Sequence, residues 1–496
     1  MQAYLALEER FRKLSGIEGA LAVLHWDFAT MMPPGGLDAR AGQIAALQSL
    51  HHERLTAPET SALLENAGQH RKDMDIWQQA NLRMMRHKWK HAVAVENDLL
   101  TEFSLAGTNC EMVWRRARAD NDFASLIPHQ QRVVDLARQV AAAKAEAFGC
   151  SPYEALLDKY DPGRTTREID TMFDNLAQFL PTFLKNVLEH QRGEQDSEPL
   201  EGPFPADKQE KLGRKFMTAL GFDFTHGRLD TSAHPFCGGV SDDIRLTTRY
   251  DTSDFATGLM GILHETGHAL YEQHLPEAWR RQPVGEVPSM TLHESQSLLI
   301  EMQVSRGRDF IAYAAPIIAE MFGRRGSAWE AANLRRHAIR VRPGLIRVDA
   351  DEITYPLHIV LRYRIEQALI AGKMQVRDIP EAWNAAMKDL LDIDVPSDRD
   401  GCMQDIHWTD GSFGYFPTYT LGALYAAQFF HTAKTRHPEI IYGIRKGDFF
   451  PLTGWLKENI HSKASLLSPN DLLIQVTGEG LNIEIYKSYL KNRYLS

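Results

Sequence analysis

The sequence has few of the features that mark secreted or disulfide-rich proteins. Its 496 residues include only four cysteines, Cys110, Cys150, Cys237 and Cys402, which lie far apart and form no CxxC pair. This distribution gives no indication of a disulfide framework or of a cysteine-ligated zinc site. A reducing compartment is the simplest setting for such a chain.

Long apolar runs are also absent. No window approaches the roughly 20 apolar residues needed to cross a bilayer. The N-terminal stretch MQAYLALEERFRKL mixes charges with apolar residues, unlike a signal peptide. With 44% hydrophobic residues, 24% charged residues and only 23 prolines, the composition is that of an ordinary globular protein. We therefore expect a cytoplasmic protein with no membrane partner.

Concentrated positive charge is missing as well. The formal net charge is -10 and is spread along the chain, which argues against a nucleic-acid partner. The basic residues of the segment 83–90 are interpreted as a solvated helix face. A small or peptide ligand fits this charge better.

What the sequence does contain is helical periodicity. Apolar residues recur at three- and four-residue spacing, as in Leu82, Met85 and Trp89, which predicts a mostly α-helical fold. The proline- and glycine-bearing stretches 31–36 and 193–205 are predicted loops. The second could be a linker, but similar helical patterning on both sides favours one domain spanning residues 1–496.

The segment 222–250 departs from this periodicity. It alternates apolar and polar residues and carries several threonines, which predicts a short antiparallel β element. It runs directly into the next predicted helix, so a small sheet is expected beside that helix.

That helix carries the stretch LHETGHALYEQHL at 263–275. His264 and His268 are four residues apart, so their rings project from the same helix face and can bind one metal ion. Glu265 is the candidate general base, because a zinc ion lowers the pKa of a bound water toward about 7 and a neighbouring carboxylate can take its proton. Gly267 in the helix interior costs about 1 kcal/mol relative to alanine. That cost indicates that something approaches closely at this position.

Two histidines do not complete a catalytic zinc site, which normally has three protein ligands. Glu294, in SMTLHESQSLLIEM at 289–302, is predicted to face the apolar side of a second helix, where an unpaired carboxylate would be costly without a metal. Thr291 and Glu294 also have capping-box spacing, so Glu294 could instead close a helix start. His274 lacks the preceding glycine turn of the longer zinc-binding motif and is interpreted as a surface or structural residue. His293 is interpreted as structural or as a support for the site.

These motifs resemble the carboxypeptidase Taq family of zinc metallocarboxypeptidases, and the resemblance extends over the chain. The matching stretches, in order, are WDFATMMPPGG at 26–36, HPF at 234–236, DIRLT at 243–247, HETGH at 264–268, HESQ at 293–296, IRVDADE at 346–352, GCMQDIHW at 401–408 and GYFPTYTLG at 414–422. The resemblance implies a mostly α-helical, elongated protomer with a deep groove, commonly a homodimer, that removes C-terminal residues from peptides. It also implies His264, His268 and Glu294 as ligands of one divalent ion, Zn²⁺ or alternatively Co²⁺, with Glu265 as base.

Hydrolysis of a peptide also requires a donor to the oxyanion that forms from the carbonyl. Tyr419 is the preferred donor by resemblance to related helical metallopeptidases, and His407 is the second candidate. Tyr415, near Tyr419, is expected to contact the substrate. Each of these side chains could equally be a core residue with satisfied hydrogen bonds.

An exopeptidase must further recognise a free carboxylate, which arginine does through a bidentate, permanently charged fork. Arg347 is the first candidate and Arg245 the second, although Asp243 could simply pair with Arg245. His234 of the HPF motif is expected to contact the substrate.

Three other functions stay open on the residues alone. A helical metallo-endopeptidase or oligopeptidase would use the same ligands. Two histidines and one carboxylate also form the facial triad of non-haem iron oxygenases, although that chemistry has no need of Glu265. Finally, a helical peptide-binding or scaffold protein could hold a purely structural metal.

Overall fold

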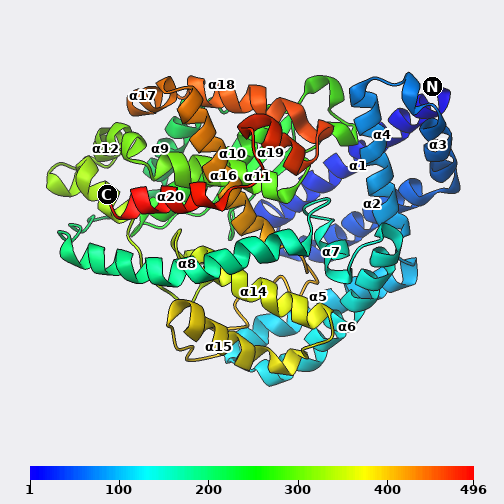
Figure 1. Cartoon of the computed structure of the whole chain (residues 1–496), viewed down its shortest axis with the longest axis horizontal. Coiled ribbons are helices and arrows are strands. Elements are labelled where there is room, and N and C mark those ends of the chain that lie inside the picture. Colours follow the sequence, from blue (N-terminus) through cyan, green and yellow to red (C-terminus); the bar gives the residue numbers. More distant parts are fainter.

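The computed structural model describes residues 1–496 and is mostly helical, as predicted (Figure 1). The helices are α1 (Gln2–Thr30), α2 (Leu37–Thr56), α3 (Pro58–Gln69), α4 (Ile76–Val93), α5 (Asn97–Asp120), α6 (Phe123–Phe148), α7 (Pro152–Leu157), α8 (Thr166–Gly193), α9 (Ala206–Ala219), α10 (Phe255–Gln273), α11 (Met290–Leu298), α12 (Arg308–Phe322), α13 (Ala331–Ala338), α14 (Tyr355–Ile370), α15 (Ile379–Leu391), α16 (Pro417–Arg436), α17 (Glu439–Lys446), α18 (Phe450–Asn459), α19 (Pro469–Thr477) and α20 (Ile483–Tyr494). The strands are β1 (Gly227–Thr231), β2 (Cys237–Val240) and β3 (Asp243–Thr248). None of the helices is both long and apolar enough to cross a membrane.

The three strands form one sheet in the order β1-β3-β2, which packs against α10 as expected. The predicted antiparallel pairing is right for β2 and β3 but wrong for β1 and β3, which run parallel. After β1 the chain crosses to the far edge of the sheet, forms β2 and turns back, so β3 lies in the middle and shares the direction of β1. At this return Gly239 has a φ of +99° and its position leaves no room for a side chain beside the Asp243 carbonyl.

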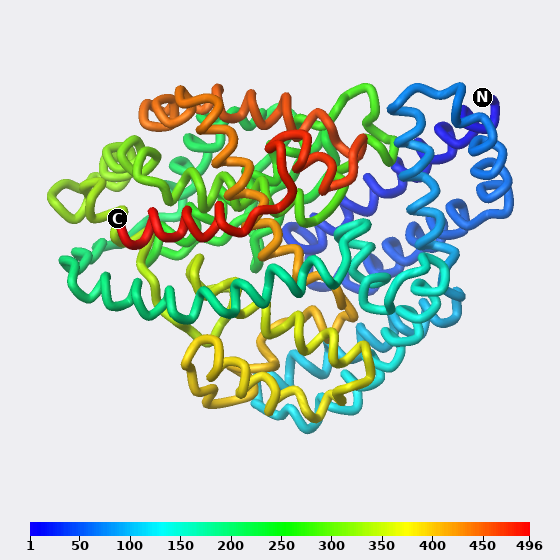
Figure 2. Tube along the Cα trace, in the orientation of Figure 1, coloured from blue at the N-terminus to red at the C-terminus, as the bar shows by residue number.

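The core has two large parts with α16 between them. Leu421, Leu424 and Ala427 of α16 belong to one hydrophobic cluster of 47 buried residues, which also draws on α6, α8 and α14. Tyr425 and Phe429 of the same helix belong to a second cluster of 45 buried residues, with α9, α10 and α12. A smaller cluster joins α1, α3 and α4, in the blue N-terminal part of the trace in Figure 2. The neighbourhood of α16 therefore lies where the two main parts meet.

The predicted loops are present at 31–36, where the chain forms a short 3₁₀ turn, and at 193–205 between α8 and α9. The second loop is packed into the molecule, since Phe204 is buried and its N–H donates to the Thr252 carbonyl at 2.8 Å.

The interpretation of 83–90 as a solvated face is wrong for Lys88. Its ammonium lies 2.6 Å from Glu286 Oε1 and 3.4 Å from Glu18 Oε1, so it joins three distant segments. A partner 198 residues away in the sequence leaves no local signal.

Candidate active site

Helix α10 places His264, Glu265 and His268 on its buried side. Asp254 caps the helix, and its side chain accepts hydrogen bonds from the Ala256 and Thr257 N–H groups. The cap satisfies two N–H groups that have no partner within the helix. From there the helix runs unbroken to Gln273, so the four-residue spacing directs both histidines to the same face.

The close approach predicted at Gly267 is made by α11. A Cβ added at Gly267 would lie 2.4 Å from the Gln296 carbonyl oxygen and 2.6 Å from Ser297 Cα. Only a glycine lets the backbones of α10 and α11 cross at this distance. The crossing brings Glu294, one turn earlier on α11, to the two histidines.

Glu294 reaches the histidines from α11 and not from a helix cap. The cap of α11 is Ser289, whose side chain accepts from the Leu292 N–H, so the capping-box alternative for Thr291 and Glu294 is wrong. On the other side Glu294 packs against α16, where a Cβ at Gly422 would lie 2.8 Å from Glu294 Cβ and Cγ. The carboxylate is thereby confined between α10 and α16.

The three side chains form a compact donor group of two nitrogens and one oxygen. Glu294 Oε2 lies 3.8 Å from His264 Nε2 and 3.4 Å from His268 Nε2. Donors about 2.0–2.2 Å from a tetrahedral zinc ion lie roughly 3.3 Å apart. The separations are close to that value, so the residues fit a divalent metal ion.

The charge states of two of the three side chains, His268 and Glu294, also suit a cation. Burial lowers the pKa of His268 to about 3, so its imidazole is neutral. Burial opposes ionisation of Glu294, but the neighbouring charge of His264 and the contact with His268 outweigh it and lower the pKa to about 2. The group therefore offers an ionised carboxylate and a neutral imidazole, the forms that bind metals.

His264 is held from behind by a second carboxylate. Its Nδ1 lies 3.0 Å from Glu301 Oε2, and since a carboxylate can only accept, the ring donates its N–H there. Glu301 Oε1 in turn accepts from Arg306 Nη2 at 2.9 Å. A carboxylate behind a ligating imidazole fixes its tautomer and raises its basicity.

His268 is packed against His293, the residue interpreted as structural. The two rings stack with centroids 4.3 Å apart, and His293 Nε2 lies 3.0 Å from Glu272 Oε1. His274 lies at the end of α10, where its Nδ1 is 3.0 Å from His461 Nδ1. Both histidines have partners of their own outside the donor group.

Glu265 is buried beside the donor group. Burial raises the pKa of its carboxyl, the charge of Glu294 adds to this and His264 opposes it, with a net value of about 7. A carboxyl group with a pKa near neutrality exchanges protons readily at physiological pH.

Tyr415, Tyr419 and His407 form an aromatic group at the start of α16, near the metal donors. Tyr415 and Tyr419 pack edge to face with ring centroids 5.2 Å apart, and His407 Nε2 lies 3.3 Å from the Tyr419 hydroxyl. Burial raises the pKa of both tyrosines, and the charge of Glu294 contributes to each shift. The hydroxyls therefore lie within electrostatic reach of the donor group and remain protonated donors at neutral pH.

Arg347 lies beside these tyrosines but is already paired. Its Nε and Nη2 donate to Asp405 Oδ1 at 2.9 and 2.8 Å, and its Nη1 donates to the Tyr355 hydroxyl at 2.8 Å. Its guanidinium carbon lies 5.1 Å from the ring centroid of Tyr419. Arg347 thus connects the aromatic group to a buried carboxylate.

Residues 6–494 match the family of Carboxypeptidase Taq (M32) metallopeptidases. This chain is a member of the M32 family. It is 37% identical to thermostable carboxypeptidase 1 of Thermus thermophilus over 99% of this chain and 98% of that protein. Metallocarboxypeptidase 1 of Trypanosoma cruzi has a similar structure, with a TM-score of 0.98 and 42% identity over 100% of both chains.

A third relative, the M32 carboxypeptidase of Deinococcus radiodurans, superposes with a TM-score of 0.94 at 33% identity over 100% of this chain and 99% of that one. The chain is therefore a metallocarboxypeptidase, a metal-dependent hydrolase that releases C-terminal amino acids from peptides. Its mostly α-helical fold is that of the family.

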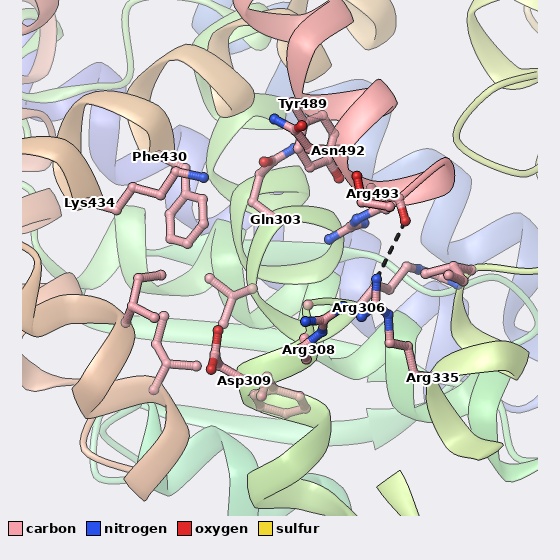
Figure 3. Close-up of a pocket in the computed structure, with 17 residues that line it drawn as sticks. Gln303, Arg306, Arg308, Asp309, Arg335, Phe430, Lys434, Tyr489, Asn492 and Arg493 are labelled. Atoms are coloured by element: carbon pink, nitrogen blue, oxygen red, sulfur yellow. Dashed lines mark hydrogen bonds between the residues drawn. The ribbon is translucent and has the colours of Figure 1, made fainter. Parts of the chain in front are cut away.

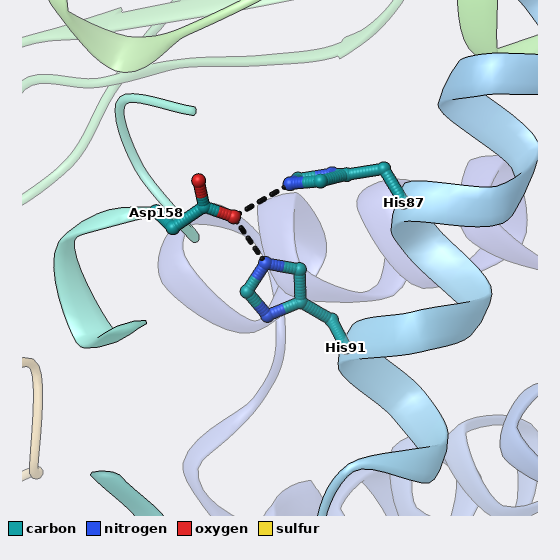
Figure 4. Close-up of side chains that lie close together, drawn as sticks. All are labelled: His87, His91 and Asp158. Carbon is teal, nitrogen blue, oxygen red and sulfur yellow. Dashed lines mark hydrogen bonds and ion pairs between the residues drawn. The ribbon is translucent and has the colours of Figure 1, made fainter. Parts of the chain in front are cut away.

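The M32 chain contains a second group of the same donor types. His87 and His91 of α4 place their Nε2 atoms 2.7 and 2.9 Å from Asp158 Oδ2, which follows α7 (Figure 4). Both distances are those of ordinary hydrogen bonds to a single oxygen. This group ties α4 to the end of α7, whereas the donors on α10 and α11 are spaced as a metal requires.

Arg245 and His234 lie on and beside the small sheet of this M32 protein. Arg245 donates from Nε and Nη2 to both oxygens of Asp243, at 3.0 and 2.7 Å, and its guanidinium lies over the ring of Trp26. The sequence had left this ion pair open as the alternative to substrate binding by Arg245. The His234 side chain is exposed at the turn before β2.

Sequence reasoning missed Glu301 and Arg306. Glu301 lies seven residues after Glu294, two helical turns, which is the signal that could have marked it. It lies in a π-helical segment, η5 (Leu299–Ser305), where each turn holds an additional residue. This widened turn brings Arg306, five residues on, to Glu301.

Proposed function

We propose that His264, His268 and Glu294 hold the single divalent ion of this carboxypeptidase, with Zn²⁺ as the first choice and Co²⁺ as the alternative. The spacing of the three donors carries this proposal. Nitrogen and carboxylate donors suit zinc and also admit other divalent ions. When bound, such an ion supplies an activated water and polarises the scissile carbonyl.

Glu265 is the general base and then the general acid of the proposed reaction. Its position next to His264 on a buried helix face supports this role, as does its pKa of about 7. The carboxylate takes a proton from the attacking water and returns it to the leaving amine. A group with this pKa can do both at neutral pH.

Tyr419 is proposed to donate its hydroxyl hydrogen to the developing oxyanion, with His407 as the second donor. The 3.3 Å contact between His407 Nε2 and the Tyr419 hydroxyl supports a shared role. Burial lowers the pKa of His407 to about 4, so its ring is neutral and can donate or accept. Tyr415 is proposed to contact the substrate beside Tyr419.

Arg347 remains the first candidate for the substrate's terminal carboxylate, since it lies beside Tyr419 and uses three of its five N–H groups in the hydrogen bonds to Asp405 and Tyr355. Arg245 is the second candidate, although its fork is occupied by Asp243. His234 is proposed as an exposed contact for more distant parts of the peptide.

The remaining assignments concern the whole protein. We propose a homodimer in the cytoplasm, built from one domain over residues 1–496, with peptides that have a free C-terminus as substrates bound in a deep groove. The packing of α16 into both main cores supports the single domain. The scattered cysteines support a reducing compartment.

The decisive experiment is mass spectrometry of a defined peptide incubated with the purified protein. A ladder shortened from the C-terminal end is expected, which disappears when a chelator is added. The same peptide with a C-terminal amide should resist cleavage. Internal cleavage of the amide would instead support an endopeptidase.

The variant Glu265→Gln tests the chemistry separately from the fold. We expect it to retain metal and peptide affinity and to lose turnover by about 10²–10⁴-fold. Unchanged peptidase activity would refute the role of Glu265. Retained metal with no peptide cleavage in the wild type would favour a scaffold protein with a structural metal.

A further inference from the structure

A cavity lined by charged and apolar side chains lies beside Arg306, whose partner Glu301 contacts His264. Its volume is about 420 Å³ (Figure 3). It is formed by η5, the start of α12, and helices α13, α16, α17 and α20. Its charged lining residues are Arg306, Arg308, Asp309, Arg335, Lys434 and Arg493.

The charge of the lining stands out in a chain with a net charge of -10. Five cationic side chains, Arg306, Arg308, Arg335, Lys434 and Arg493, face one cavity. Asp309 is the acidic side chain of the lining. The cavity therefore has an excess of positive charge.

Three of these cations have no acidic partner. Arg306 pairs with Glu301, and Arg493 pairs with Glu352 at 3.1 Å. No salt bridge is formed by Arg308, Arg335 or Lys434, and Arg335 donates only to the Arg493 carbonyl at 3.5 Å. Burial and then the charges of Arg308 and Arg493 lower the pKa of Arg335. Arg308 and Arg335 therefore repel one another, and neither has a salt-bridge partner.

The arrangement of the cations is convergent. In Figure 3 the side chains of Arg306, Arg308 and Arg335 gather on one side of the cavity, Arg493 extends toward them, and Lys434 stands on the opposite side. The first turn of α12 also lines the cavity, and its cap residue Gly307 provides no side-chain hydrogen bond. An anion there would meet arginine forks together with the positive end of a 15-residue helix.

The cavity also connects to His264 through two hydrogen bonds. Arg306 Nη2 lies 2.9 Å from Glu301 Oε1, and Glu301 Oε2 lies 3.0 Å from His264 Nδ1. An anion bound near Arg306 would neutralise part of the guanidinium charge that acts on Glu301. The Glu301 carboxylate would then attract the His264 N–H more strongly and increase the basicity of Nε2.

We propose that this cavity binds a small molecule bearing a dianionic phosphate group, held by Arg308, Arg335 and Arg306, and that occupancy strengthens the hold of His264 on its metal. A volume of about 420 Å³ is in the range of small-molecule sites and leaves room beyond the phosphate itself. The phosphate binding stands on the cavity alone. The effect on the metal rests on the proposed role of His264.

The first test is calorimetry of the holoenzyme with inorganic phosphate and with a nucleoside monophosphate, at constant ionic strength. Saturable binding is expected, and tighter binding of the monophosphate would identify an organic phosphate as the ligand. The double variant Arg308→Gln/Arg335→Gln should weaken binding by roughly tenfold to a hundredfold or more. Arg377→Gln/Arg399→Gln removes the same charge at exposed sites with long ion pairs and should leave binding unchanged.

No saturable heat in the wild type, or equal binding by both double variants, would overturn the phosphate site. The second test follows metal loss to a chromophoric chelator, corrected for phosphate alone. Phosphate should slow the loss in the wild type but not in Arg308→Gln/Arg335→Gln. An unchanged rate in the wild type would overturn the connection to His264, and peptidase activity enters neither test.

Discussion

His264 is constrained at both nitrogens of its ring. Nε2 faces Glu294 across 3.8 Å, while Nδ1 is held by Glu301, which is itself held by Arg306. His268 has no such support, because its buried Nδ1 has no hydrogen-bond partner and its ring rests on His293. His264 is therefore oriented by a charged hydrogen-bond partner, whereas His268 is oriented by stacking on another ring.

The support behind His264 can be weakened without touching a proposed ligand. Glu301→Gln keeps an oxygen that can accept from the ring but removes the carboxylate charge. We expect metal affinity to fall by about 10–100-fold, measured by competition with a chelator of known affinity. Glu330→Gln, an exposed change on the same chain, is the control. Equal affinities for the two variants would contradict the role of Glu301.

Metal binding should also depend on pH through His264. Burial opposes its protonation, but the charge of Glu294 and the hydrogen bond to Glu301 outweigh burial and raise the pKa to about 10. Without an ion the ring therefore carries a proton at neutral pH, which a metal must displace. Apparent affinity should rise by about tenfold per pH unit from pH 7 to 9.

Calorimetry in buffers with different heats of ionisation checks this dependence. At least about one proton should be released per metal bound at pH 7.5. Heats that do not vary between buffers would show that His264 is already neutral.

At the scale of elements, the site is the crossing of α10 with α11, closed by α16. The sequence predicted α10 and its ligands because the helical period and the HExxH spacing are local properties. It also predicted a close approach at Gly267 from the cost of glycine in a helix. It could not predict that α11 makes this approach, because nothing local identifies the partner of a packed helix face.

Gly267→Ala tests whether the close contact between α10 and α11, and not helix propensity alone, requires a glycine here. The new Cβ would clash with the backbone of α11 and push Glu294 away from the histidines. We expect a loss of stability of at least about 1–3 kcal/mol and a large loss of metal affinity, measured by denaturant unfolding and chelator competition. Gly261→Ala on the same helix meets nothing within 4 Å and should be neutral or stabilising by up to about 1 kcal/mol. Similar behaviour of the two variants would contradict the packing argument.

The sheet shows the same limit of sequence reasoning. Alternation of residues predicted strands at 222–250 but contains no information on their order, so the parallel pairing of β1 with β3 was missed. Asp405, which accepts from Arg347 and Arg362, was missed for a related reason, since its partners lie 58 and 43 residues away. Local patterns predict elements, whereas charge pairs between distant segments appear only once the chain is folded.

At the scale of the whole molecule, α16 joins the two main hydrophobic clusters. Its residues alternate between them within two turns, so neither cluster can lose α16 without exposing apolar surface in the other. We expect one cooperative unfolding transition at neutral pH, seen by calorimetry and coincident with loss of both helical and aromatic circular dichroism. Two separated transitions would contradict the assignment of one domain.

The π-helical segment behind His264 has a consequence for tolerance to insertions and deletions. Arg306 meets Glu301 because the Arg306 N–H bonds to the Glu301 carbonyl five residues back, at 3.1 Å. Removing a single amino acid from 299–305 would restore the narrower α-helical repeat and abolish this five-residue bond, so that Arg306 would no longer meet Glu301. The number of residues in this stretch therefore matters more than the identity of most of them.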